Sequence, residues 1–257
     1  MLAKTIHYSI DDTIQTFKQL TEKKPISIFD IKMFAFLRNL HLKYGIVVSC
    51  YCFYEYGAFS LKECTRSYRT EFEQNSSWLR FGFHGWSGAE DYAVQDIELS
   101  KKQYNQLLSS LMEIVGKSSV DRFPRIHTFQ ASQEFVSWMY SHPKFPIIGL
   151  LSADDNRISY SLTKRFCQQL TQKGCLDFQG VKYLRTTQRF DSLNLRKMRQ
   201  LFAYTGGQVV LFTHEWVFYP KSFKMRVKAY LIKRLMMLTA SYYTKKCYIP
   251  SFSMDKY

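Results

Sequence analysis

Short apolar runs that stop at a histidine or a carboxylate recur along the chain. The first run, residues 6–10, ends in the adjacent pair Asp11 and Asp12. Four later runs follow the same rule and end at His84, at His127, at Asp154 with Asp155, and at His214 with Glu215. Parallel strands covered on both faces read as near-continuous apolar runs, and α/β barrels carry their chemistry at the carboxyl ends of the strands. Five such endings on one rim would form a single site.

Segments with apolar residues at a spacing of three and four alternate with these runs and predict helices. The helices are expected at residues 13–20, 28–43, 61–72, 100–115, 132–140, 162–170, 193–204 and 223–243. The strands are expected at residues 6–10, 46–53, 79–83, 123–126, 145–153, 180–186 and 209–213. Alternating strands and helices are typical of a parallel sheet. The sequence therefore predicts one α/β domain over residues 1–257, which ends in a basic amphipathic helix.

This last helix, at residues 223–243, has two interpretations. Leu231, Leu235 and Leu238 recur at helical spacing among lysines and arginines. A basic amphipathic helix can lie on an anionic membrane. More often such a helix packs its apolar face on the sheet and exposes its basic face, and we favour this second interpretation.

Composition restricts the class of protein further. A chain of 257 residues with 46% hydrophobic residues can bury a core without disulfides. Its six cysteines show no CxxC spacing, and Cys50 and Cys52 fall on one side of an expected strand as small core residues. No run of eighteen apolar residues and no apolar signal segment is present. We expect a cytoplasmic protein with reduced cysteines.

The formal net charge of +15 favours an anionic partner such as nucleic acid, a membrane surface or a phosphorylated substrate. The basic residues are spread along the chain, and the sequence contains no signature of a nucleic-acid-binding module. We therefore expect no nucleic acid partner, although peripheral contact with the inner face of an anionic membrane through residues 223–243 stays open.

Asp11 and Asp12 are the first candidates for chemistry. Neighbouring carboxylates repel each other, so a fold usually keeps such a pair where a cation or a reacting proton offsets the charge. The alternative is that one of them caps the helix expected at residues 13–20, because aspartate is a favoured N-cap residue. Two other histidines, His41 and His142, are expected to take no part, with His142 exposed beside a proline.

These endings together resemble the polysaccharide deacetylase (NodB-homology) superfamily, in particular a divergent branch associated with O-antigen and other surface-glycan biosynthesis. Residues 9–12 are similar to the paired-aspartate motif, and residues 81–84 to the metal-histidine motif. Residues 125–127 are similar to the arginine motif, Asp154 and Asp155 to the later acid motif, and residues 211–214 to the terminal histidine motif.

The resemblance implies a distorted (β/α)7 barrel that uses a divalent metal to hydrolyse an N-acetyl group on a sugar. It implies that Asp11 is the catalytic base, Asp12 a metal ligand and His214 the catalytic acid, with Asp154 also in a catalytic role. We expect Arg125 to keep Asp11 ionised. We expect zinc as the metal, with nickel, cobalt or manganese as alternatives.

One position departs from this pattern. The family's second metal histidine stands four residues after the first, where this chain has Gly88. His127 lies two residues after Arg125, so both side chains would point to one face of an extended strand. We therefore predict a metal site of Asp12, His84 and His127. Glu90 and Asp91, in the loop after His84, are the alternatives for the third ligand.

The leading functional hypothesis is a metal-dependent hydrolase that removes an N-acetyl group from a nucleotide-linked or lipid-linked glycan precursor. The anionic phosphates of such a substrate would suit the positive charge of the chain. The alternative is a catalytically silent barrel that binds glycan or scaffolds a biosynthetic complex. A third hypothesis, a phosphate-binding or nucleic-acid-binding protein, rests on charge alone.

Overall fold

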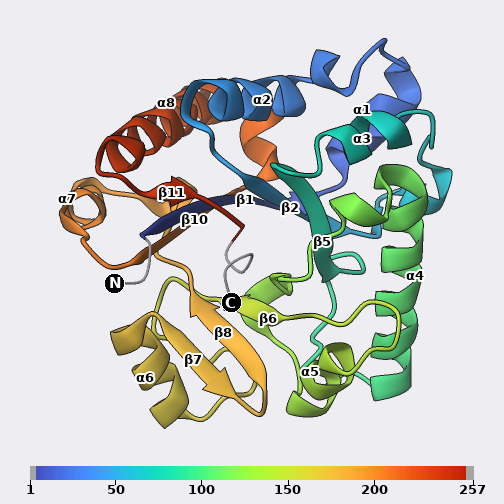
Figure 1. Ribbon diagram of the computed structural model, residues 1–257. Helices are drawn as coiled ribbons and strands as arrows, with labels where there is room; N and C mark the ends of the chain where they lie inside the picture. Colours follow the sequence, from blue (N-terminus) through green and yellow to red (C-terminus); the bar gives the residue numbers. More distant parts are fainter. Residues whose placement is uncertain (1–3, 253–257) are drawn as a thin grey trace.

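The first strand, β1 (Thr5–Thr13), lies inside a sheet in which every pairing is parallel (Figure 1). The structure is a computed structural model that describes residues 4–252. The predicted domain boundaries, within residues 1–3 and 253–257, lie outside the described residues. The strand order is β5–β2–β1–β10–β9, with β11 also on β1. Their bounds are β2 (Val48–Phe53), β5 (Leu79–Gly85), β9 (Gln188–Arg189), β10 (Gln208–His214) and β11 (Ile249–Pro250).

A second sheet of three strands completes the β-structure around the core. Here β6 (Gly149–Ser152) pairs in parallel with β8 (Val181–Arg185), which forms an antiparallel hairpin with β7 (Cys175–Phe178). No strand was expected at the position of β7. A small separate hairpin joins β3 (Glu55–Tyr56) to β4 (Phe59–Ser60).

Single backbone hydrogen bonds connect the two sheets where regular ladders stop. On one side, Asp121 N donates to Phe81 O at 2.8 Å and Leu151 N donates to Pro124 O at 3.0 Å. On the other side, Thr187 N donates to the carbonyl of Val210 at 2.8 Å. The α/β fold with a mostly parallel sheet is thus confirmed, and its strands follow the order of a distorted barrel.

The strand expected at residues 123–126 does not form a ladder. Pro124 has no N–H to donate to a neighbouring strand. The N–H of Phe123 is also unavailable, because it donates to Asp121 Oδ1 at 2.8 Å. This segment still lies between β5 and β6, but it is irregular and the prediction of a regular strand was wrong.

Helices cover the outside of the strands (Figure 1). The α-helices are α1 (Gln15–Lys23), α2 (Lys32–Tyr44), α3 (Arg69–Gln74), α4 (Ile97–Val115), α5 (Gln133–Tyr140), α6 (Lys164–Lys173), α7 (Leu195–Ala203) and α8 (Phe223–Lys245). The 3₁₀ turns are η1 (Ile28–Asp30), η2 (Leu61–Glu63), η3 (Lys117–Ser119), η4 (His127–Phe129), η5 (Phe190–Ser192) and η6 (Glu215–Phe218). The helices expected at 28–43 and 61–72 are each split into a 3₁₀ turn and a shorter α-helix.

The closing helix α8 packs on the sheet as favoured, but through a different stripe of side chains. Leu235 is buried as expected, whereas Leu231 and Leu238 are exposed. The packed side chains include the small Ala229 and Ala240, which let the helix approach β1 closely enough for the Tyr8 hydroxyl to donate to Met236 O at 2.9 Å. Within the described residues, no helix combines the length and the apolar character needed to cross a membrane.

His142 is buried, so its expected exposure was wrong. Its Nδ1 accepts from the backbone N–H groups of Lys144 and Phe145 at 3.2 and 2.9 Å, while Nε2 contacts Asn105 Oδ1 at 2.8 Å. The ring therefore closes the turn after α5 and has a structural role. Cys50 and Cys52 are buried free cysteines, as predicted.

Glu215 caps helix α1 from the far end of the chain. Its carboxylate accepts from the backbone N–H groups of Ile14, Gln15 and Thr16 at 3.0, 2.8 and 2.7 Å. These donors are the groups that a helix N-terminus leaves unpaired. The alternative in which Asp11 or Asp12 caps this helix was therefore wrong. Burial raises the pKa of Glu215 to about 7.

We predict that Glu215→Gln lowers the free energy of unfolding. An amide offers one acceptor oxygen in place of two and turns its NH₂ group toward backbone donors. Leaving buried donors unpaired should cost roughly 1–3 kcal/mol, which a chemical denaturation curve would measure. Glu134→Gln, at an exposed position in the first turn of α5, is the matched control. Equal stability of the two variants would contradict the capping role.

Candidate active site

A buried ion pair joins Arg125 to Asp11 below the rim of the barrel. Arg125 Nη1 donates to Asp11 Oδ1 at 2.8 Å and to Ser9 Oγ at 2.7 Å. Nη2 donates to Thr186 Oγ1 at 3.0 Å, and the guanidinium lies 4.2 Å from the ring centroid of Phe212. Arg125 is 0% exposed and Asp11 is 2% exposed. The predicted partnership of Arg125 with Asp11 is present.

Asp12 is turned toward the same region by a break in the strand. Neighbouring residues of a regular strand point to opposite faces, so Asp11 and Asp12 would normally diverge. Here Asp12 has a φ of 61°, and the register between β1 and β2 shifts between Ile10 and Thr13. Aspartate tolerates this left-handed conformation better than most residues, and a bulge of this kind re-aims a side chain.

His84 is fixed by hydrogen bonds at both ring nitrogens. Its Nδ1 lies 2.5 Å from Arg125 O, and its Nε2 lies 3.2 Å from Asp12 Oδ1. A second register shift, where β5 passes Cys52 and Phe53 of β2, accompanies this position. A carbonyl that binds one imidazole nitrogen orients the other, which is the arrangement found behind metal-bound histidines.

His127 completes a group of three candidate ligands. One ligand atom from each of Asp12, His84 and His127 lies within 4.8 Å of the others, as the sequence predicted. The expectation that Arg125 and His127 share one face of an extended strand was wrong, because the chain enters the turn η4 after Ile126. The turn nevertheless brings the His127 ring to 5.4 Å from the His84 ring, centroid to centroid.

The donor set fits a divalent metal. One carboxylate and two imidazoles form a common set of protein ligands for zinc at a hydrolytic site, which keeps a fourth position open. The Nδ1 of His127 is buried and has no hydrogen-bond partner among the described residues. Burial and the neighbouring His84 hold the pKa of His127 below its ordinary value, so the neutral, ligating form is favoured.

The side chain of Phe53 fills the space beside Gly88. A Cβ placed on Gly88 would lie 3.0 Å from Phe53 Cζ, and the φ of Gly88 is +90°. The same phenyl ring lies 5.0 Å from the His84 ring and 5.3 Å from the His127 ring, between centroids. Phe53 therefore occupies the space into which a histidine at position 88 would extend, and the two remaining histidines pack against it.

Glu90 and Asp91 shape their own loop. Glu90 accepts from Ser87 N and Gly88 N at 2.9 and 3.0 Å, and Asp91 Oδ1 accepts from Ala93 N at 2.9 Å. Hydrogen bonds to Ser87 and Gly88 keep the pKa of Glu90 low against the opposing effect of burial. Neither residue belongs to the group formed by Asp12, His84 and His127.

His214 lies across β1 from this group and is held by an acid that the sequence analysis missed. His214 is the register partner of Asp11 in the β1–β10 ladder. Its Nδ1 lies 2.7 Å from Asp191 Oδ2, and Arg189 Nε lies 3.1 Å from Asp191 Oδ1. Asp191 follows strand β9 closely, so the rule of acids at strand ends could have found it.

The electrostatics of His214 and Asp12 are complementary. Burial lowers the pKa of His214, but the hydrogen bond that His214 donates to Asp191 and the charges of Asp11 and Asp12 outweigh this effect, so the net pKa is raised. Burial raises the pKa of Asp12, but His84, His214 and His127 outweigh it, so the net pKa is lowered. The rim thus favours a protonated imidazole opposite an ionised carboxylate.

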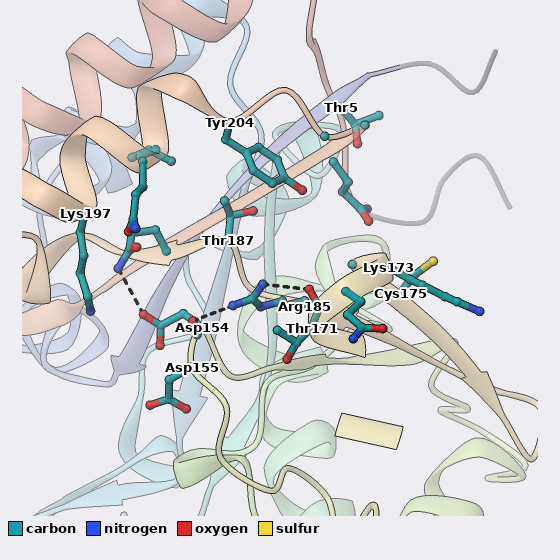
Figure 2. Close-up of a pocket in the computed structure, with 18 residues that line it drawn as sticks. Thr5, Asp154, Asp155, Thr171, Lys173, Cys175, Arg185, Thr187, Lys197 and Tyr204 are labelled. Carbon is teal, nitrogen blue, oxygen red and sulfur yellow. Dashed lines mark hydrogen bonds between the residues drawn. The ribbon is translucent and has the colours of Figure 1, made fainter. Parts of the chain in front are cut away.

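Asp154 and Asp155 lie elsewhere. They line a cavity of about 640 Å³ between β8, α6 and α7, in which the guanidinium of Arg185 lies between Asp154 and Thr171 (Figure 2). Asp154 Oδ2 accepts from Arg189 N at 3.3 Å, and Asp155 binds Arg157. The structure shows no contact of either carboxylate with the histidines described above, so the catalytic role of Asp154 stays a prediction without a structural basis.

Comparisons with known proteins concern the fold alone. No protein-family model matches the sequence, and no curated protein matches it either. Among solved structures, a peptidoglycan N-acetylglucosamine deacetylase is 8% identical with a TM-score of 0.53, over 97% of this chain and 86% of that chain. A candidate polysaccharide deacetylase from Mycobacterium smegmatis is also 8% identical with a TM-score of 0.53, over 99% and 96%. The likeness is one of fold.

A third solved structure shows why the fold does not decide the activity. The 4-α-glucanotransferase from Thermococcus litoralis is 11% identical with a TM-score of 0.56, over 94% of this chain and 38% of that chain. Polysaccharide deacetylases and a glucanotransferase thus share this architecture. One fold can host unrelated chemistries, so the function must be argued from the side chains.

We predict that His127→Ala and His84→Ala both weaken zinc binding, measured by calorimetric titration and by metal content after dialysis. Mutation of a residue that only orients a metal ligand typically lowers metal affinity by about 10–100-fold. Loss of a ligand itself should therefore lower zinc affinity by at least about 100-fold. Asp91→Ala is the matched control and should bind zinc like the parent protein. If His127→Ala kept full zinc binding and Asp91→Ala lost it, the third ligand would have to be assigned to the loop after His84 instead.

Proposed function

We propose that this protein is a metal-dependent hydrolase that removes an N-acetyl group from a sugar. The observation that carries the proposal is the order of groups along one rim. A three-residue metal-ligand group stands next to an Arg125-paired carboxylate, and an Asp191-paired imidazole stands on the neighbouring strand. Amide hydrolysis needs a base for water and an acid for the departing amine, and this order supplies both.

Asp11 would act as the base. Arg125 holds Oδ1, so proton transfer from water would use Oδ2. Because the guanidinium itself is fixed by Ser9 and Thr186, the carboxylate is held in one orientation. Positioning of this kind contributes to the rate because no reorientation is needed as the reaction proceeds.

His214 would act as the acid. With Nδ1 engaged by Asp191, only Nε2 can deliver a proton to the leaving nitrogen. The raised pKa keeps the imidazole protonated over a wider pH range than a free histidine. Asp191 is thus a positioning residue, because it acts on the substrate only through His214.

Asp12, His84 and His127 would hold the divalent metal. A bound metal supplies polarisation of the amide carbonyl and a lowered pKa for water. We expect zinc, with nickel, cobalt or manganese as alternatives. The carbonyl of Arg125 ties the orientation of His84 to the same residue that positions Asp11. Ligand geometry and base geometry therefore depend on one segment of chain.

The substrate class is part of this proposal. The solved neighbours named as deacetylases include one for N-acetylglucosamine in peptidoglycan. The net charge of +15 favours a substrate that carries phosphate, such as a nucleotide-linked or lipid-linked precursor of a surface polysaccharide, as in O-antigen biosynthesis. The cytoplasmic location expected from the sequence belongs to the same proposal.

The direct test is release of acetate from N-acetylglucosamine oligomers and from a nucleotide-linked N-acetylglucosamine, with zinc added. Asp11→Asn should lower kcat by about 10²–10⁴-fold, because it removes the base, while zinc binding persists. Asp177→Asn, at an exposed position on β7, is the control and should keep the parent activity.

Two results would decide against the proposal. Zinc binding without acetate release from any acetylated sugar would favour the silent, glycan-binding barrel. Loss of activity in Asp154→Asn with full activity in Asp11→Asn would move the chemistry to the other cavity.

The pH dependence gives a second test. As an acid, His214 must be protonated, so activity should fall as the pH rises through its raised pKa. In Asp191→Asn the main cause of the increase is removed while burial still lowers the pKa. The alkaline limb of the kcat profile should therefore move to lower pH, with the acidic limb unchanged. An unchanged alkaline limb would show that His214 is not the acid.

A further inference from the structure

Three neighbouring helices contain basic residues but no acidic ones. Helices α2, α7 and α8 contain three, three and six basic residues respectively, and none of the chain's 21 acidic residues. Helix α8 contacts α2 along one side of the sheet, and α7 lies next to the C-terminal end of α8 (Figure 1). The hydroxyls of Tyr242 and Tyr243 donate to backbone carbonyls of α7. The three neighbouring helices thus contain twelve lysine and arginine residues and no carboxylate side chain.

Helix α8 has a second apolar stripe opposite the one that packs on the sheet. Successive helical residues turn by about 100°, so the exposed apolar side chains fall within an arc about 100° wide. Three of them, Phe223, Leu231 and Leu238, are 81%, 60% and 56% exposed, and Val227 and Tyr230 lie in the same arc. A surface helix normally turns polar residues to this side.

The basic residues of α8 border this exposed stripe. On the same geometry Lys224 and Lys228 fall on one flank and Arg226 and Lys233 on the other, with Arg234 inside the arc. An apolar stripe bordered by lysine and arginine is the pattern of a helix that lies in a membrane interface. The stripe and its borders are therefore suited to a surface that is both apolar and anionic.

A basic cavity lies on the flank that faces α2. It has a volume of about 540 Å³ and is lined by Lys32 of α2, by Arg226 and Lys233 of α8, and by Tyr219 and Pro220. No carboxylate lines it. Three cations around one cavity beside an apolar stripe match a phosphate headgroup whose acyl chains lie along that stripe.

We propose that the face formed by the exposed stripe of α8 and the cavity around Lys32, Arg226 and Lys233 docks on a membrane of anionic phospholipid. The stripe enters the headgroup region, and the basic flanks contact lipid phosphates. The inner face of a cell membrane is the natural site, because anionic lipids give that leaflet a negative surface potential. This inference does not depend on the proposed deacetylase activity.

Other occupants match the face less well. Nucleic acid binds basic residues through phosphates and gives no reason to expose Val227, Leu231 and Leu238 between them. A second copy of this chain would bring two basic faces together, which charge repulsion opposes. A membrane surface accounts for the apolar stripe and the charge at once.

Vesicle co-sedimentation tests the proposal with the full chain. Binding should require phosphatidylglycerol in phosphatidylcholine vesicles and should weaken as salt rises. Arg226→Gln with Lys233→Gln should lower partitioning by about 30-fold. Phe223→Ser, Leu231→Ser and Leu238→Ser combined should lower it at least as much, and all three positions are exposed, so folding should persist.

Matched controls distinguish binding through this face from non-specific binding through net charge or through exposed apolar side chains elsewhere. The charge control is Lys102→Gln with Lys117→Gln, both exposed and outside the three helices. The apolar control is Ile26→Ser with Val94→Ser, which are 99% and 83% exposed. Both should bind vesicles like the parent protein. Equal losses in controls and test variants would overturn the proposal.

A fluorescent reporter tests insertion itself. Tyr230→Trp, on the stripe, should shift its emission to the blue on vesicle addition and be quenched by brominated lipid. Tyr140→Trp, exposed on α5, should not. Absence of any shift at position 230 would overturn the proposal. Retention on polyuridylate through Arg226 and Lys233, without vesicle binding, would assign the face to nucleic acid instead.

Discussion

The buried guanidinium of Arg125 holds the barrel and the site together. Its hydrogen bonds reach Ser9 and Asp11 on β1 and Thr186 just beyond β8, and its carbonyl binds His84 on β5. Loss of one partner of a buried ion pair costs about 3–5 kcal/mol, because the other charge stays buried and unpaired. The segment around Arg125 does not form a regular strand ladder, so side-chain hydrogen bonds connect it to strands that are elsewhere joined by backbone pairing. The geometry of Asp11, the proposed base, and of His84, a proposed metal ligand, therefore cannot change independently of the fold.

The second constraint is the alternation of side chains along a strand. Two adjacent aspartates can serve one site only if the strand is interrupted, and the positive φ of Asp12 together with the register shift beside it provides the interruption. A non-glycine residue in this conformation costs about 1–3 kcal/mol, which the surrounding structure must offset. The cap that Glu215 places on α1 begins two residues later, at Ile14, and fixes the chain directly beyond the strained residue. A distant glutamate thus supports the orientation of Asp12.

The sequence predicts this fold and site as far as local patterns reach. Apolar runs located the strands, and their polar endings located Asp11, Asp12, His84, His127 and His214, all of which the structure brings to one rim. Three predictions failed, two of them through contacts between residues that are close in the sequence. Pro124 and Asp121 together removed the strand at 123–126, and the turn after α5 buried His142. Helix α8 has two apolar stripes, and only the shape of the sheet beneath it decides which one packs. Asp191 was missed for a different reason, because the strand-end rule that selected Asp154 applied to Asp191 as well.

Gly88 stands where the family that the sequence resembles has its second metal histidine, and a group of three candidate ligands is present without it. Strand ends converge on one rim, so a candidate ligand that the loop after β5 lacks can come from the next segment of the chain, which carries His127. The arrangement involves Phe53, whose ring fills the space beside Gly88 and packs on both His84 and His127. A histidine at position 88 would collide with that ring, and its backbone would have to adopt a φ that residues other than glycine rarely adopt. Phe53, Gly88 and His127 are therefore packed interdependently, so that a change at one of the three positions would disturb the contacts of the other two.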